Sequence, residues 1–250
     1  MPRKSISIIL FLMVILLSWN RATISNAALL PATPTAAANP LTGTWEFSFG
    51  TMTLTQKGAR VTGTYQWYGG GNSGKIRGIF LSGLNQFSGL WVSDGGGLQS
   101  QGLFRLQLAP DGNSFNGVFE RASTRLPWCG VRAGSALPAG CGFSGEWQMR
   151  FGSPAGVGQA TLIQAGPILT GTFTNSAGQT GQIVEGLIVT HSQTEARATG
   201  TWREGQGQPE SFDWRLNLTT GTTFQGRRDP GKSDWCGWRE GVTEAQPCGW

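Results

Sequence analysis

The stretch Trp128-Cys129-Gly130-Val131-Arg132, followed after eight residues by Cys141-Gly142, decides the organisation of this chain because it occurs twice. Its second copy is Trp235-Cys236-Gly237-Trp238-Arg239, again followed after eight residues by Cys248-Gly249. The two copies use all four cysteines of the 250-residue chain. We therefore interpret the sequence as an internal duplication of one unit that ends in a cysteine-closed loop.

Further short segments fall into register when the two motifs are aligned. The matched pairs are Gly43–Trp45 with Gly145–Trp147, Thr62–Tyr65 with Thr170–Phe173, Gly78–Phe80 with Gly186–Ile188, Gly89–Trp91 with Gly200–Trp202, Phe104–Leu108 with Trp214–Leu218, and Phe115–Gly117 with Phe224–Gly226. The offset between the copies changes from pair to pair, so the insertions lie between the segments, as expected if the segments are strands joined by loops. The first unit is assigned to residues 41–142 and the second to residues 143–250, each of ordinary domain size.

Apolar residues occupy alternate positions within these segments, for example in Trp45–Phe49 and in Phe104–Leu108. This period of two is typical of strands with one buried face and one wet face. Turn-forming residues such as Gly69–Asn72 and Asp111–Asn113 separate the strands. No segment after residue 28 has a sustained helical period. We predict an all-β fold of two tandem antiparallel meanders of about seven to eight strands each, closed as barrels or folded as sandwiches.

A glycine stands two residues before an aromatic side chain in many of these strands, as at Gly89 and Trp91. Residues two apart share one face of a sheet, so the glycine is expected on the inner face beside a ring. Glycine within a strand usually marks a tight bend or a close approach. Its repetition favours a strongly coiled sheet, and therefore a small barrel over a two-sheet sandwich.

The two units resemble the calycin group, which includes the lipocalin and avidin-type up-and-down barrels. The resemblance rests on the single-meander layout, on Gly43-x-Trp45 and Gly145-x-Trp147 in the first strand of each unit, and on an arginine after the last strand, Arg132 or Arg239. In that group the first-strand tryptophan packs under a basic side chain from the end of the barrel. The resemblance implies that Arg132 and Arg239 close their barrels through cation–π contacts with these two tryptophans.

The beginning of the chain is typical of an exported protein. Arg3 and Lys4 precede an apolar run, Ile6–Leu17, and small residues stand at the end of Ser25-Asn26-Ala27. We predict a cleavable secretory signal over residues 1–27, followed by a linker rich in proline, alanine and threonine over residues 28–40. The mature chain is expected to be secreted or extracytoplasmic, with no membrane span. Because disulfides persist in oxidising compartments, we expect the pairs Cys129–Cys141 and Cys236–Cys248.

The charge of the chain excludes one class of partner. The net charge is +5, but Arg3, Lys4 and Arg21 lie in the predicted signal, which holds no acidic residue. The remaining chain is nearly balanced and has no basic cluster beyond Arg227-Arg228. We therefore expect no nucleic-acid partner.

The residues around the cysteines form the first candidate binding surface. Trp128, Trp235 and Trp238 stand next to Arg132 and Arg239, and rings beside guanidinium groups can stack on sugars or anchor a protein partner. The alternative is that Trp128 and Trp235 fill the ends of their own barrels.

The interior of the second unit is the other candidate site. The inward positions of the first unit are occupied by large rings that leave little space for a ligand. In the second unit Asn175 stands opposite Trp67, and Arg228 stands opposite Phe119. One interpretation is that these replacements open a cavity with polar groups that hold a small apolar ligand. The other is that the two copies have diverged without a change of function.

The sequence contains no motif that indicates catalysis, a metal or a cofactor. His191 is the only histidine and no nucleophile motif accompanies it. The cysteines lack the short spacing and the histidines of a zinc site. We predict a secreted, non-enzymatic binding or adhesion protein that binds glycan or protein through the ends closed by the cysteine pairs or through exposed strand faces. The alternative is a lipocalin-like carrier with a small apolar ligand in the second unit.

Overall fold

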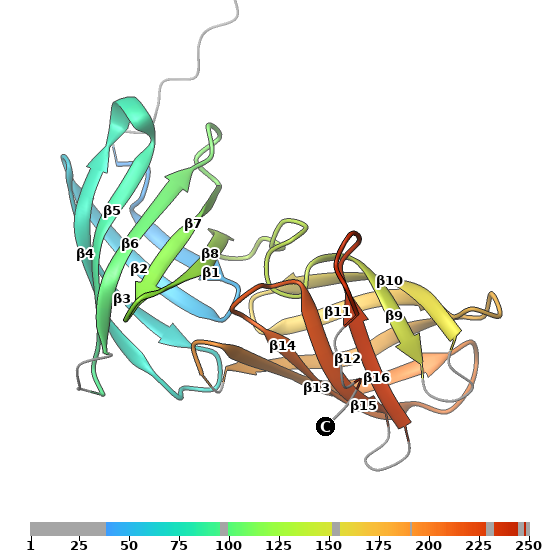
Figure 1. Ribbon diagram of the computed structural model, residues 1–250. Helices are drawn as coiled ribbons and strands as arrows, with labels where there is room; N and C mark the ends of the chain where they lie inside the picture. Colours follow the sequence, from blue (N-terminus) through green and yellow to red (C-terminus); the bar gives the residue numbers. More distant parts are fainter. Residues whose placement is uncertain are drawn as a thin grey trace, which may run out of the picture. The chain divides into compact units, whose positions relative to one another are not determined.

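The computed structural model describes residues 39–95, 100–151, 156–190, 192–228, 233–244 and 248. The predicted signal and all of the linker except Asn39 and Pro40 lie outside these residues. Residues 37–250 form one compact unit. It consists of two closed antiparallel barrels of eight strands each, which follow one another along the chain (Figure 1). The prediction of a tandem all-β fold is confirmed, and the barrel is the correct choice over the sandwich.

Each barrel is a meander in which every strand pairs with the next and the last strand pairs with the first. The strands of the first barrel are β1 (Gly43–Phe47), β2 (Gly50–Lys57), β3 (Arg60–Trp67), β4 (Ser73–Leu81), β5 (Gln86–Ser93), β6 (Gln101–Leu108), β7 (Ser114–Arg121) and β8 (Thr124–Arg132). Those of the second barrel are β9 (Gly145–Phe151), β10 (Gly156–Ala165), β11 (Ile168–Thr174), β12 (Thr180–Thr190), β13 (Glu195–Glu204), β14 (Glu210–Asn217), β15 (Thr223–Arg228) and β16 (Ser233–Trp238). A single turn of 3-10 helix, Ser82–Leu84, is the only helix in the described part of the chain.

The inner-face glycines let neighbouring strands approach closely. A Cβ atom on Gly102 would lie only 1.8 Å from the carbonyl oxygen of Glu120 and 2.7 Å from Nε1 of Trp91. The Trp91 ring instead covers this position, and its Nε1 donates a hydrogen bond of 3.1 Å to the Glu120 carbonyl. The missing side chains therefore make room for backbone as well as for rings, which permits the tight curvature of a small barrel.

The strand pairing corrects one segment of the sequence alignment. Gly89 pairs with Phe104 in the first barrel, whereas Gly200 pairs with Phe212 in the second. Phe212 is therefore the counterpart of Phe104, and the match of residues 104–108 with residues 214–218 was wrong by two positions. A shift of two residues keeps every side chain on the same face, so the apolar pattern does not reveal it.

Hydrogen bonds join the two barrels within the compact unit. Gln164 is fully buried; its Oε1 accepts a bond from the backbone N–H of Phe143, and its Nε2 donates to the Ser48 carbonyl at 3.0 Å. The backbone N–H of Thr190 donates to the Tyr68 carbonyl at 2.9 Å. These bonds connect loop and strand ends of the second barrel to the β1–β2 and β3–β4 connections of the first.

No helix in the described residues is long and apolar enough to cross a membrane.

Candidate functional site

Both predicted disulfides are present, Cys129–Cys141 in the first unit and Cys236–Cys248 in the second. The first packs in a small apolar cluster with Val131 and Leu137. Each bond ties the last strand of its barrel to the segment that follows it. These cysteines therefore act as structural staples.

The two arginines implied by the calycin resemblance lie on the two first-strand tryptophans. The guanidinium carbon of Arg132 is 4.0 Å from the ring centroid of Trp45, and that of Arg239 is 4.0 Å from the ring centroid of Trp147. Arg239 also donates to the Gly142 carbonyl at 3.0 Å. Burial lowers the pKa of the Arg239 guanidinium to about 10. Because the barrel itself uses their donors, we assign both arginines to closure of the barrel ends and not to ligand binding.

Trp128 and Trp235 are core residues, which confirms the alternative that they fill their own barrels and shows that the interpretation of their rings as a surface for a partner is wrong. Trp128 is 4 % exposed and Trp235 is completely buried. The Trp128 ring lies 5.5 Å from that of Phe119, and the Trp235 ring lies 4.8 Å from that of Trp214. Their alternating strand positions point inward, so they fill the barrels. Trp238 is half-buried at the end of β16, and His191 lies outside the described residues.

The first barrel retains a cavity of about 20 Å³ among its rings. It is lined by Phe47, Phe49, Tyr65, Trp67, Trp91, Phe119, Trp128 and Gln193. The last of these comes from the β12–β13 connection of the second barrel and is 7 % exposed. A space of this size accommodates about one water molecule. This cavity therefore has no room for an organic ligand, in line with the large inward rings that surround it.

Asn175 and Arg228 lie at the same end of the second barrel, and each contacts an acidic neighbour. Asn175 Nδ2 donates to Glu204 Oε1 at 3.3 Å. Arg228 lies over the Trp202 ring at 5.3 Å and forms a 3.4 Å ion pair with Glu210. These two residues therefore form part of a polar rim above packed rings.

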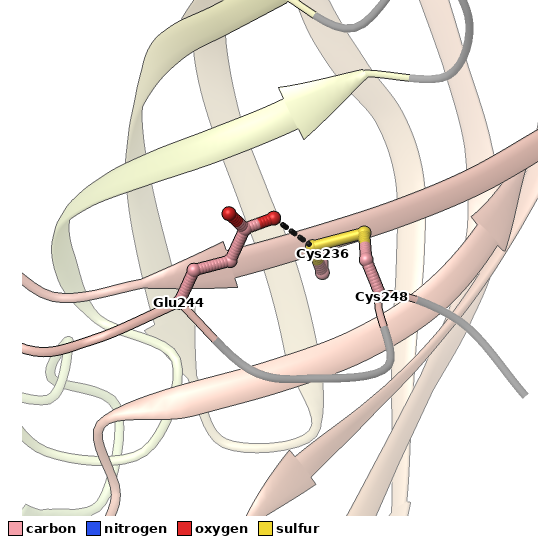
Figure 2. Close-up of side chains that lie close together, drawn as sticks. All are labelled: Cys236, Glu244 and Cys248. Atoms are coloured by element: carbon pink, nitrogen blue, oxygen red, sulfur yellow. Dashed lines mark hydrogen bonds between the residues drawn. A yellow bond between two sulfur atoms is a disulfide. The ribbon is translucent and has the colours of Figure 1, made fainter.

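Cys236, Glu244 and Cys248 form the one cluster in the described residues whose side chains have the types and the proximity of metal ligands, with their ligand atoms within 4.8 Å of one another (Figure 2). Both sulfur atoms are bonded in the disulfide, and metals bind the thiolate form of cysteine. The Glu244 carboxylate accepts both hydrogen bonds of an ion pair with Arg150, one of them 2.6 Å long. The Arg150–Glu244 ion pair therefore fixes the loop closed by the disulfide to β9, and the cluster does not fit a metal centre.

An open groove of about 450 Å³ lies on the outer wall of the first barrel. We call it the outer groove and define it by its lining residues, Ile79, Ser88, Gly89, Leu103, Phe104, Arg105, Val118, Glu120 and Arg125. They come from β4 to β8. Ile79 and Leu103 are 47 % and 56 % exposed and both line this one groove, and it is such a shared patch, more than any single exposed apolar residue, that is informative.

Strand pairing assembles the outer groove from residues far apart in the sequence. One row across the sheet runs from Ile79 through Ser88 and Arg105 to Val118. The next row places Leu90 beside Leu103. Rim charges are provided by the exposed Arg105 and by the pair Arg125–Glu120, whose atoms are 3.0 Å apart.

The outer groove is not among the candidate sites of the sequence analysis, because those are the inward rings and the residues around the cysteines. The signal was present in the outward positions. Leu90, Leu103 and Val118 are apolar where the alternation calls for polar residues. At the equivalent register positions, the second barrel has Thr201, Ser211 and Arg227.

Comparison of the chain with protein-family models, with curated proteins and with solved structures gives no match.

Proposed function

We propose that this chain is an exported, non-enzymatic binding protein and that the outer groove of its first barrel is the binding surface for a protein partner. The observation that carries the proposal is the groove itself. Its volume of about 450 Å³ lies within the range of about 300–1,000 Å³ typical of ligand sites. Exposed apolar side chains framed by charged ones are typical of protein interaction sites.

The difference between the two barrels supports this assignment. Both copies keep the buried tryptophans, the staple and the stacked arginine, which the fold requires. Only the first copy combines Leu90, Leu103 and Val118 on one patch of its outer wall. Such residues contribute nothing to a barrel core, so a role at the surface explains them better than stability does.

Export is supported by the predicted signal and by the two disulfides, which persist in oxidising compartments. We propose a calycin-type relationship for the barrels on the basis of their eight-stranded meanders and of the stacks of Arg132 on Trp45 and Arg239 on Trp147. The relationship concerns architecture alone.

A carrier for a small apolar ligand in the second barrel is the alternative candidate. The rim of Asn175 and Arg228 above the Trp202 ring favours it. Against it, Trp235 is completely buried and its ring packs 5.0 Å from that of Trp202. A ligand would have to displace these rings, so we prefer the outer groove.

A peptide-display selection tests the proposal. Binders selected on the full chain are assayed against the double variant Ile79→Ser/Leu103→Ser and against the matched control Ile163→Ser/Leu187→Ser, which alters equally exposed residues on the second barrel. We expect binding to be lost with the first variant and kept with the second. Binders that are indifferent to both variants, or lipophilic compounds that raise the transition temperature of all three proteins equally, would overturn the assignment.

A further inference from the structure

The charges around the outer groove indicate the chemistry of the partner; this inference rests on the proposed binding role of the groove. Arg105 lines the groove, and Arg77 lies next to it in the neighbouring row of the sheet, where it pairs with Leu90. Both side chains are exposed, and neither has an acidic ion-pair partner in the described part of the chain. Arg125 is paired with Glu120, the one acidic residue in the lining. One uncompensated positive charge, Arg105, therefore lies in the groove, and a second, Arg77, lies beside it.

The centre of the groove favours a protein segment over a glycan or a nucleic acid. Leu103 and Ile79 are its most exposed apolar side chains. Phe104, the only aromatic residue in the lining, is 3 % exposed and offers no ring face for stacking on a sugar or a base. Sugars and single-stranded nucleic acids are usually held by such stacking.

A second copy of the same face is disfavoured by its own charge. Two outer grooves brought face to face would place the Arg77 and Arg105 side chains of both copies in one interface. Like charges placed across an interface oppose association. The partner must instead bring negative charge to these arginines and apolar groups to the centre.

We infer that the outer groove binds an acidic protein segment that carries apolar side chains. The second barrel presents the opposite chemistry at the equivalent positions. Glu185 corresponds to Arg77, Asp213 to Arg105, and Ser211 to Leu103. Binding of such a segment is therefore confined to the first barrel.

Short fluorescent peptides test the inference directly on the full chain. Leucine alternates with glutamate in the first probe, with serine in the second and with lysine in the third, and a heparin-derived oligosaccharide is the fourth. We expect the leucine–glutamate peptide to bind most tightly in an anisotropy titration. We also expect its affinity to fall as salt is added, because its contacts to Arg77 and Arg105 are exposed.

Two variants separate this inference from the proposed function. Leu103→Ser and Arg105→Asp introduce the residues that the second barrel carries at the same positions, so both are compatible with this fold. We expect Arg105→Asp to lower the affinity for the leucine–glutamate peptide about tenfold and to leave the affinity for the leucine–serine peptide unchanged. The control substitution Leu187→Ser on the second barrel should change the affinity for neither peptide.

The outcomes that contradict the inference are distinct. If the leucine–serine peptide binds as tightly as the leucine–glutamate peptide and both are weakened by Leu103→Ser, the groove binds proteins but not acidic ones. If the oligosaccharide binds most tightly and displaces the peptides, the partner is a sulfated glycan. If self-association sensitive to Leu103→Ser appears instead, the occupant is a second copy. If Leu103→Ser affects no probe, the proposed function itself fails.

Discussion

The guanidinium group of Arg239 lies over the ring of Trp147, with 4.0 Å between the guanidinium carbon and the ring centroid. The same arginine reaches back to the Gly142 carbonyl in the segment between the barrels. One side chain therefore fixes the last strand, the first strand and the entry of the second barrel.

Arg239→Ala should lower the free energy of unfolding by about 2 kcal/mol, because it removes a stacked cation and a hydrogen bond from a partly buried position. Denaturant titration followed by tryptophan fluorescence measures this. Arg105→Ala, at an exposed site, is the control and should change the free energy of unfolding by less than about 0.5 kcal/mol. Equal stabilities of the two variants would contradict the structural role assigned to Arg239.

Gln164→Leu should cost about 2 kcal/mol, because it leaves the backbone N–H of Phe143 without its buried acceptor and removes the bond to the Ser48 carbonyl. The exposed Gln159→Leu is the matched control on the same strand. A calorimetric scan of each variant provides the measurement. If the barrels are not joined through Gln164, the loss should be no greater than that of the control.

Tyr65 and Tyr68 are the only tyrosines, and both are buried. Burial raises the pKa of Tyr65 to about 12 and raises the pKa of Tyr68 still further. Since the folded state prefers the neutral phenols, this contribution to stability is present below the ordinary tyrosine pKa and is lost as the pH rises from about 10 through the folded pKa. Absorbance at alkaline pH should show no tyrosine ionising near pH 10 in the folded chain and both ionising there in denaturant. If the tyrosines of the folded chain ionised near pH 10, their rings would be exposed and not buried.

Alkylation in denaturant followed by mass measurement should detect no free thiol in the mature chain. Reducing either disulfide should lower the free energy of unfolding by about 3 kcal/mol, the loop-entropy value for a loop of this length. A cysteine that reacts without reductant would contradict the pairing of Cys129 with Cys141 or of Cys236 with Cys248.

The features that could be predicted from the sequence depend on periodicity and duplication. Alternation in segments such as Trp45–Phe49 indicated strands, the doubled motif indicated two units and two staples, and the glycines favoured a barrel. The stacks of Arg132 and Arg239 followed from a family resemblance and not from any local pattern.

The remaining features depend on register, which alternation does not determine. A shift of β14 by two residues keeps its inward side chains on the inner face, so the apolar pattern does not reveal it. Trp214 was therefore matched to Phe104, although the true counterpart of Phe104 is Phe212. The outward apolar positions could be read from the sequence, but their assembly into the outer groove could not, because Ile79 and Arg105 become neighbours only through the pairing of three strands. For Trp128 and Trp235 both a buried and a surface position stayed open, because the place of the cysteine motif within a strand was unknown.

Methyl NMR of the chain, with isoleucine, leucine and valine labelled, detects peptide binding in the outer groove when an acidic leucine-containing peptide is added. We expect the methyl signals of Ile79, Leu103 and Val118 to shift together and to saturate, while those of Ile163 and Leu187 on the second barrel stay in place. Saturable shifts confined to the second barrel, or no shifts in the outer groove, would show that the groove is not the binding surface.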